Sequence, residues 1–391
     1  MACTPALPTL LVIPTGIGCE LGGYAGDGLP AARLLAAASG CLITHPNALN
    51  GASLYWSDRR LHYVEGWGLD RFAAGDLALR PVPGRRIGLL LDAAIEPELL
   101  ERHLQAAEAC RASLGLSIGP VVVSDAPLGV GLSLGPSGVS WGGLERPDAL
   151  LRAGERLVAA GATAIAVVAR FPDEPASEAL AAYRHGSGVD ALAGAEAVIS
   201  HLLVQHLGLP CAHAPALAPL PLDPDLDPRA AAEELGHTFL PCVLVGLSRA
   251  PDLVPLRGTV AAPPQAGSPP PTNLAPIAAA PSTGGWASWR PVQPDLEGAA
   301  ALLSAASLGA VVAPAGALGG EAVLACAERG VPLIAVANRS LLQVDAAALG
   351  LEVIPAASYA EAAGLVLALR EGLDPAALRR PLERMRRLEI L

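Results

Sequence analysis

The chain has 391 residues, of which 52% are hydrophobic and only 3% aromatic, and its formal net charge is -11. This length suits one large domain or two, with a core built mainly from Ala, Leu and Val. The acidic balance argues against a nucleic-acid partner, because the protein would repel a polyanion.

All 26 basic residues are arginine, since the sequence contains no lysine. This excludes a Schiff-base lysine, a Ser–Lys dyad and a Walker lysine. The seven cysteines are scattered and form no CxxC pair, which predicts free thiols in the reducing cytoplasm. No secretory signal and no apolar run of membrane-spanning length is present, so we expect a soluble protein without a membrane partner.

Short apolar runs alternate along the chain with longer segments of helical periodicity. The expected strands are Leu10–Pro14, Cys41–Thr44, Ile87–Asp92, Pro120–Ser124, Ala164–Arg170, Cys242–Gly246, Val311–Ala313, Leu333–Ala337 and Glu352–Ile354. The expected helices are Leu29–Ser39, Pro97–Leu114, Asp148–Ala160, Gly194–Leu207, Glu297–Ser307, Glu321–Arg329 and Tyr359–Arg370. This alternation predicts an α/β fold with mostly parallel, Rossmann-like sheets and helices on both faces.

Composition divides the chain into four parts. Residues 1–254 are expected to form a larger α/β domain, and residues 255–295 a flexible insertion rich in proline and alanine. Residues 296–373 predict a compact βαβαβα unit, and residues 374–391 an arginine-rich C-terminal helix.

Polar residues follow many of the expected strands, at the edge where open parallel sheets bind ligands. They include Thr15, His45, Asp92, Asp125, Arg170, Ser248 and Arg249. We expect Arg170 or Arg249 to hold an anion, His45 or His213 to act as acid or base, and Asp92 or Asp125 to orient or deprotonate the substrate. The general polarity of loops explains part of this pattern equally well.

Two glycine-rich segments precede expected helices and could offer backbone N–H groups to an anion. The first contains Gly16, Gly18, Gly22, Gly23 and Asp27, and the second ends with Gly319 and Gly320. The first is not a dinucleotide fingerprint, because Leu21 occupies the third glycine position, and it is not a P-loop, because it has no lysine. A tight structural loop is the alternative.

Further candidates lie in two polar segments. Asn47 and Asn50 follow His45, where Asx turns could also explain them. Asp190 precedes the expected helix Gly194–Leu207, and His213 follows it. A metal site built from His201, Cys211 and His213 with Asp223 is a weaker alternative to buried core histidines, so the sequence assigns no metal and identifies no cofactor.

Five runs carry a resemblance to a known family: IPTGIGCELGGYAGDGLPAARLLAAASGCLITHPNALNG, YVEGWGLDRFAAG, SDAPLG, GVDALAGAEAVISHLLVQHLGLPCAHAPALAPLPLD and AAAEELGHTFLPCVLVGLSRAP. They closely resemble an uncharacterised family of cyanobacteria and plastids, catalogued as domain of unknown function 3326. The resemblance covers nearly the whole chain apart from the proline-rich insertion. It implies a photosynthetic cell, but it supplies no reaction, cofactor or catalytic residue.

The sequence therefore predicts an enzyme that acts on a small anionic metabolite, bearing phosphate or carboxylate, at the carboxyl-end rim of a parallel sheet. The alternatives are a non-catalytic ligand-sensing or assembly factor and a metal-dependent hydrolase. The substrate and reaction type are left open, and a homo-oligomer is compatible with the sequence.

Overall fold

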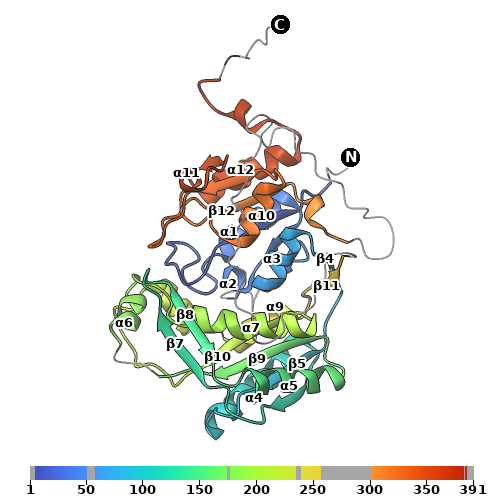
Figure 1. Ribbon diagram of the computed structural model, residues 1–391, viewed down its shortest axis with the longest axis vertical. Helices are drawn as coiled ribbons and strands as arrows, with labels where there is room; N and C mark the ends of the chain where they lie inside the picture. The colour runs from blue at the N-terminus through green and yellow to red at the C-terminus, as the bar shows by residue number, and fades with distance from the viewer. Residues whose placement is uncertain are drawn as a thin grey trace.

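The computed structural model describes residues 5–50, 58–173, 177–234, 239–256, 302–382 and 384. These residues form two lobes, each built around a parallel sheet, and Figure 1 shows them one above the other. The first lobe contains the described residues between 5 and 80 and between 252 and 382, and the second lobe those between 85 and 250. The predicted α/β class with mostly parallel sheets is confirmed.

The first lobe has a six-stranded sheet in the order β14-β13-β12-β1-β2-β3, with every neighbouring pair parallel. Its strands are β1 (Thr9–Leu11), β2 (Leu42–Thr44), β3 (Leu61–Tyr63), β12 (Ala310–Pro314), β13 (Leu333–Val336) and β14 (Ile354–Ala356). Its helices are α1 (Leu29–Ser39), α2 (Pro46–Leu49), α3 (Gly66–Ala74), α10 (Glu321–Glu328), α11 (Ala346–Leu349) and α12 (Tyr359–Arg370).

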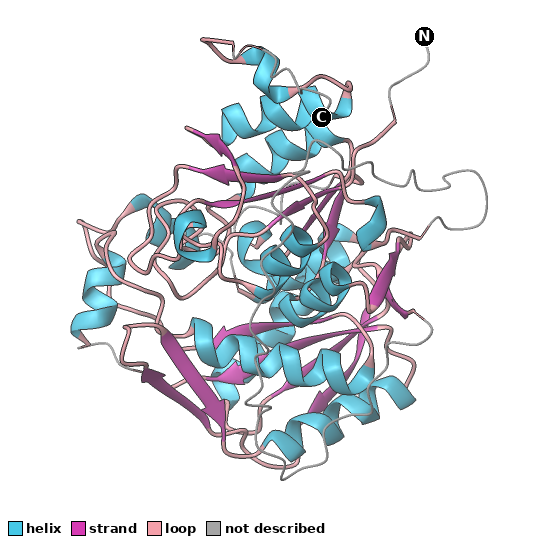
Figure 2. Cartoon of the chain, turned by 45° about the horizontal axis from the view of Figure 1, so that its top comes forward, coloured by secondary structure: helices cyan, strands magenta, loops and turns pink. Residues whose placement is uncertain are grey.

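Helices cover both faces of this sheet. Helix α1 packs beside α12, and α3 packs beside α10. Successive strand residues enter different cores: Leu11 lies in the cluster that contains α1 and α12, and Leu10 in the cluster that contains α3 and α10. Figure 2 shows the strands between helices. Burial on both faces explains why these strands are apolar throughout rather than alternating.

The second lobe has a four-stranded parallel sheet in the order β10-β9-β5-β6. Its strands are β5 (Ile87–Leu91), β6 (Ile118–Val123), β9 (Ala164–Arg170) and β10 (Cys211–Ala216), and β7 (Val130–Leu134) and β8 (Ser140–Leu144) form an antiparallel hairpin beside it. Its helices are α4 (Pro97–Leu114), α5 (Pro147–Ala159), α6 (Glu178–Arg184), α7 (Ala193–Leu207), α8 (Pro228–Glu234) and α9 (Leu240–Leu247).

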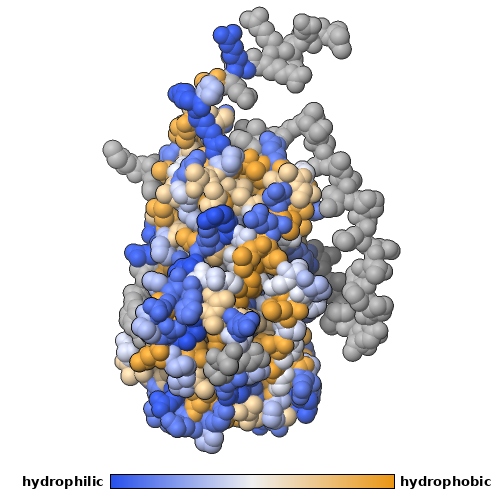
Figure 3. Space-filling view, turned by 90° about the vertical axis from the view of Figure 1, so that its left-hand side faces the viewer, coloured by the Kyte–Doolittle hydropathy of each residue, from blue (hydrophilic) through white to orange (hydrophobic). Residues whose placement is uncertain are grey.

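The chain crosses between the lobes twice, beside the antiparallel pair β4 (Leu77–Arg80) and β11 (Asp252–Pro255). Hydrophilic residues are spread over the visible part of the side shown in Figure 3. No helix in the described ranges combines the length and the hydropathy that a membrane span requires.

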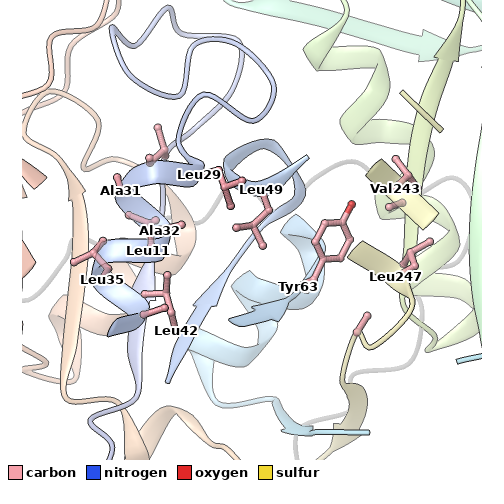
Figure 4. Packing of buried hydrophobic residues seen from close by; sticks show 14 of the residues in the cluster. Leu11, Leu29, Ala31, Ala32, Leu35, Leu42, Leu49, Tyr63, Val243 and Leu247 are labelled. Atoms are coloured by element: carbon pink, nitrogen blue, oxygen red, sulfur yellow. The ribbon is translucent and has the colours of Figure 1, made fainter. Parts of the chain in front are cut away.

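A hydrophobic core joins the two lobes. Tyr63 at the end of β3 lies between Leu49 of the first lobe and Val243 and Leu247 of α9, as Figure 4 shows. Gly246 makes this approach feasible, because a Cβ there would lie 2.4 Å from the tyrosine ring. The Tyr63 hydroxyl donates to Asn50 Oδ1 at 2.9 Å. The lobes are therefore held together by apolar packing in addition to the two chain crossings.

Three expectations need correction. The run Cys242–Gly246 is not a strand but the middle of α9, which begins with Pro241 in its first turn. A short run buried on all sides has no periodicity that separates a strand from a helix. Ser248 and Arg249 consequently follow a helix. The described part of the expected helix Glu297–Ser307 holds only the 3₁₀-helix Ala305–Ser307, and the described part of the C-terminal helix only the 3₁₀-helix Pro375–Leu378.

The sheets join parts of the chain that the sequence assigned to separate domains. The described part of residues 296–373 contains β12, α10, β13, α11, β14 and α12 in βαβαβα order. Its first strand pairs with β1, so the unit extends the N-terminal sheet instead of forming its own. Most of the expected insertion, residues 257–295, lies outside the described residues.

Candidate functional site

A cavity of about 120 Å³ lies between the lobes, and we call it the interlobe cavity. The first lobe contributes the polar residues Thr15, His45, Asn47, Asn50 and Glu65, which follow β1, β2 and β3. The second lobe contributes Asp190, Glu196, Ser200, His201, His213 and Glu233. Among the residues that the structure describes, the lining thus holds four carboxyl groups and three imidazoles, and none of these lining residues is an arginine.

Glu65 links the two lobes at the base of this cavity. It directly follows β3 and caps α3, because its Oε2 accepts the Trp67 N–H at 2.9 Å. Its Oε1 accepts the Ser200 hydroxyl at 3.2 Å and lies 3.0 Å from His201 Nε2. Burial lowers the pKa of His201, but the hydrogen bond and charge of Glu65 outweigh it, so the pKa is raised. The pair therefore favours a protonated His201.

His213 on β10 continues this network. Its Nδ1 lies 3.1 Å from Ser200 Oγ, and its Nε2 lies 3.6 Å from Glu196 Oε2. Because the Ser200 hydroxyl donates to Glu65, Ser200 Oγ accepts from His213, which places the neutral imidazole's proton on Nδ1. Nε2 then carries the lone pair, and Glu196 is placed to stabilise a proton that arrives there.

The spatial arrangement of Ser200, His213 and Glu196 resembles a hydrolase triad, but Ser200 cannot act as the nucleophile of such a triad. Its residue is only 2% exposed and lies in the middle of α7. Backbone N–H groups in a helix interior are already hydrogen-bonded, so they cannot form the oxyanion hole that acyl transfer requires. Ser200 is placed instead to pass a hydrogen bond from His213 to Glu65.

His45 has a different role from the one that its position after a strand suggested. Its Nε2 accepts the Ile13 N–H at 3.0 Å, so the neutral ring carries its proton on Nδ1. Burial lowers its pKa to about 4. His45 is therefore neutral at physiological pH and can offer a ligand an N–H donor, but its basic nitrogen is already used.

Two carboxyl groups on the second lobe have raised pKa values. Asp190 accepts the Leu192 N–H at 2.9 Å where α7 begins, and burial together with the charge of Glu196 raises its pKa. Glu233 accepts the Tyr183 hydroxyl at 2.7 Å and the Ala25 N–H at 3.0 Å. Burial and the charge of Asp190 raise the pKa of Glu233. The described lining of the cavity is thus rich in carboxyl groups, and burial disfavours the charged form of two of them.

The first glycine-rich segment is a tight structural loop whose N–H groups bind other protein groups. Leu21 N–H donates to Asn338 at 3.0 Å, Gly22 N–H to Asp27, and Gly26 N–H to the Asn47 carbonyl. Burial raises the pKa of Asp27 to about 7. Gly16, Gly18 and Gly22 have positive φ, and a Cβ on Gly22 would lie 2.2 Å from Ile13, while a Cβ on Gly23 would lie 2.2 Å from the Cys19 carbonyl oxygen.

The second glycine-rich segment also lacks the expected role. Gly319 and Gly320 precede α10, but the Ala322 N–H in its first turn donates to Asp70 Oδ1 at 3.1 Å. A carboxylate of α3 therefore already occupies the position at which a bound anion would sit.

The residues at the carboxyl end of the second sheet belong to other contacts. Asp92 is fully buried and accepts the N–H groups of Leu128, Ala94 and Arg170. The Arg170 side chain pairs with Glu96 and Asp173, and Asp125 pairs with Arg152 on the surface. The expectation of a single shared rim is wrong, because the strands form two sheets with separate carboxyl ends.

Ser248 and Arg249 also lie away from the interlobe cavity. They line a wider hollow of about 580 Å³ near residues that precede β5 and β6, at the amino ends of the second sheet. The Ser248 hydroxyl donates to the Val245 carbonyl at 2.7 Å.

The proposed ligand set of the metal alternative does not assemble. Cys211 is fully buried and contacts the Leu209 carbonyl, and Asp223 pairs with His185 at 2.9 Å. Within the described ranges, no group of three or more His, Cys, Asp or Glu side chains is placed to hold a metal ion.

Of the predicted site residues, the cavity brings together Thr15, His45, Asn47, Asn50, Asp190 and His213. The prediction missed Glu65, Glu196, Ser200 and Glu233. One signal was available for two of them: Glu196 and Ser200 are four residues apart on α7, so they share a helical face. Glu65 follows β3, a strand that the sequence analysis did not identify.

Comparison with known proteins places the whole chain in context. A model of the family described as "Protein of unknown function (DUF3326)" matches residues 8–267 and 287–379. An uncharacterized lipoprotein of Synechococcus sp. (strain ATCC 27144 / PCC 6301 / SAUG 1402/1) is 53% identical over 374 residues, which cover 95% of this chain and 93% of that protein. No solved structure matches the chain. All the cavity residues named above lie within the matched ranges.

Proposed function

We propose that this chain, which belongs to the DUF3326 family, binds a small metabolite with a positively charged group in the interlobe cavity and transfers a proton to or from it. The observation that supports the proposal is the lining of the cavity, whose described residues include four carboxyl groups and three imidazoles from two lobes and no arginine. A positively charged ligand group would interact favourably with this acidic lining, in which Glu65 and Glu196 already pair with His201 and His213.

A cationic group suits this lining better than the phosphate or carboxylate expected from the sequence. The helix N-termini that would attract an anion are already occupied by protein carboxylates. Glu65 accepts from the first turn of α3, and Asp190 accepts at the start of α7. An additional anion would meet these charges at close range in a poorly solvated space, where repulsion is strong.

His213 is the residue best placed for acid–base chemistry. His213 lines the cavity, its Nε2 lies 3.6 Å from Glu196 Oε2, and its Nδ1 lies 3.1 Å from Ser200 Oγ. An imidazole whose orientation is set by one nitrogen can exchange a proton through the other. His45 would position the ligand by donating its Nδ1–H to it. Glu65 would keep the side chains of Ser200 and His201 in place through its contacts with both.

The ligand class is tested by titrating the protein with small amines and with carboxylates and phosphates of similar size, using calorimetry and thermal shift. We expect amines to raise Tm and anions to leave it unchanged. Glu196→Gln should weaken amine binding, whereas Asp125→Asn, which removes a carboxylate outside the cavity, should not. Stabilisation by anions alone would refute the proposal.

Proton transfer is tested with amines that also carry a carbonyl group, because a C–H next to a carbonyl releases its proton to a base while the carbonyl oxygen takes up the electron pair. Deuterium incorporation at that carbon in D2O is followed by NMR. His213→Gln should slow incorporation by about 100-fold or more. His206→Gln is the matched control, because His206 lies on the same helix as Ser200 but pairs with Glu155 at the surface. Binding without any exchange would instead support a non-catalytic ligand-sensing function.

We also propose a cytoplasmic location. Cys19, Cys41, Cys110, Cys211 and Cys326 are buried and form no disulfide within the described residues, which suits a reducing compartment. The Synechococcus relative carries the word lipoprotein in its name, so the intact mass of the protein isolated from its own cells is the direct test. An added acyl mass would contradict the proposal.

A further inference from the structure

A second cavity, of about 160 Å³, adjoins the interlobe cavity, and we call it the side cavity. The two cavities share Asp190, Leu192, Glu233 and Phe239. The side cavity extends from these residues toward α6 and the hairpin strand β7. It is lined mainly by apolar groups, namely Leu132, Pro172, Ala179, Leu180, Val189 and Leu217.

We propose that the side cavity holds the apolar part of the ligand whose charged group lies in the interlobe cavity, so that the ligand is an amine carrying one aromatic ring or a branched aliphatic group of similar size. This inference rests on the proposed function. Its basis is the change in lining chemistry at the shared wall. Asp190 and Glu233 lie at that wall. On one side the lining holds histidines and carboxyl groups, and on the other it is mostly apolar, with Asp173, Ser177 and Glu234 among the leucines, alanines and prolines.

The volume of the side cavity sets the size of the apolar group. An apolar protein cavity of roughly 150 Å³ accommodates a benzene ring. At about 160 Å³, the side cavity has room for one such ring.

The wall between the cavities is held by a rigid set of contacts. Tyr183 lines the side cavity and donates its hydroxyl to Glu233 Oε2 at 2.7 Å. Its ring stacks on Tyr24 of the glycine-rich loop, with centroids 4.4 Å apart, and the guanidinium of Arg229 lies over Tyr24. The carboxylate that would bind the amine is therefore fixed by residues that also shape the apolar space.

Four probes separate the requirement for charge from the requirement for the ring: methylamine, benzylamine, benzyl alcohol and benzoate. We expect benzylamine to bind roughly ten- to hundredfold more tightly than methylamine, because burying a ring of this size has that effect on an association constant. Benzyl alcohol and benzoate should each bind at least about tenfold more weakly than benzylamine, because neither compensates the carboxylates.

A matched pair of variants locates the ring. Ala179→Phe fills the side cavity from α6, whereas Ala181→Phe places the same bulk on an exposed position of that helix outside the lining. Ala179→Phe should weaken benzylamine binding by about tenfold and leave methylamine binding unchanged. Ala181→Phe should change neither, and Tm measurements verify that both variants are folded.

The outcomes distinguish this inference from the function on which it rests. If methylamine binds and responds to Glu196→Gln, but benzylamine binds no more tightly or ignores Ala179→Phe, the side cavity is not a ligand subsite although the proposed function stands. If neither amine binds and benzoate does, both proposals are overturned.

Discussion

Glu65 and His201 belong to different lobes, and their side chains meet 3.0 Å apart across the interlobe cavity. Glu65 is fixed at the N-terminus of α3, while His201 lies on α7. The site therefore exists only when the two lobes are correctly packed, and perturbing this pair should report on the cavity without unfolding either sheet.

Gly66→Ala tests that relationship directly. A Cβ on Gly66 would lie 2.9 Å from His201 Nε2, so the partly exposed imidazole would have to move away from Glu65. We expect the pKa of His201, followed by NMR titration, to fall toward or below its ordinary value. The free energy of unfolding should change by less than about 1 kcal/mol, because the end of a side chain moves easily.

Gly364→Ala is the control for that experiment. Gly364 lies inside α12, and a Cβ there would meet nothing within 4 Å. Alanine should stabilise the helix by up to about 1 kcal/mol and leave the pKa of His201 unchanged. An unaltered His201 pKa in Gly66→Ala would show that the ion pair tolerates displacement.

Below pH 6.5, the free energy of unfolding should fall because the unfolded chain can protonate His45 more easily than the folded protein. Its folded-state pKa is about 4, below the ordinary value of 6.5, so the unfolded chain takes up a proton that the folded protein excludes. The stabilisation is present above pH 6.5 and is lost as the pH falls toward 4. It amounts to about 2 kcal/mol once partial exposure is allowed for.

His45→Gln isolates this contribution, because an amide oxygen can still accept the Ile13 N–H. In urea denaturation at pH 7 and pH 4.5, the wild-type protein should lose more stability than the variant between the two conditions. Equal losses would mean that His45 does not titrate as its burial requires.

Amine affinity should increase with pH. Because the pKa values of Asp190 and Glu233 are raised, both carboxyl groups bind protons more readily than free carboxyls, and only the ionised forms attract a cation. Calorimetry in buffers of different ionisation enthalpy should detect protons released on binding between pH 6 and pH 8. Asp190→Asn should flatten the pH dependence, and Glu155→Gln, at the surface beside His206, should preserve it.

Substitution of Asp92 should cost much more stability than substitution of Asp125, although both follow strands of the same sheet. Asp92→Ala leaves one buried and two partly buried N–H groups without their acceptor and should cost about 3 kcal/mol in the free energy of unfolding. Asp125→Ala removes an exposed ion pair with Arg152 and should cost less than about 1 kcal/mol. A small loss for Asp92→Ala would reopen a functional role for that residue.

Local sequence signals predicted some elements well. Helices α1, α4 and α12 match the predicted bounds, because Pro marks the start of α1 and α4, Ser358 caps α12, and Gly40 and Gly115 end the first two. The strands β3, β4 and β11, of three or four residues, were not predicted, and neither were the longer β7, β8 and β10. Polar residues, Gly or Pro interrupt most of these runs, so they lack the continuous apolar pattern by which the other strands were identified.

The candidate site was predictable only where it depends on one lobe. Thr15, His45, Asn47 and Asn50 lie together because they follow neighbouring strands of one sheet, as expected for carboxyl ends. Glu65 and Glu233 became recognisable only through partners in other elements, whereas the spacing of Glu196 and Ser200 on one helix was a local signal. No property of the local sequence indicates which lobe a carboxylate will face.

The pairing of β1 with both β2 and β12 bears on how the chain acquires its structure during synthesis. The second lobe is encoded by one uninterrupted stretch, so it can fold as soon as that stretch leaves the ribosome. Strand β1 must wait for a partner made about 300 residues later, with one edge exposed in the meantime. Until β12 is made, the exposed edge of β1 can pair with other chains. We therefore expect chaperones that bind this edge to improve folding of the newly synthesised protein.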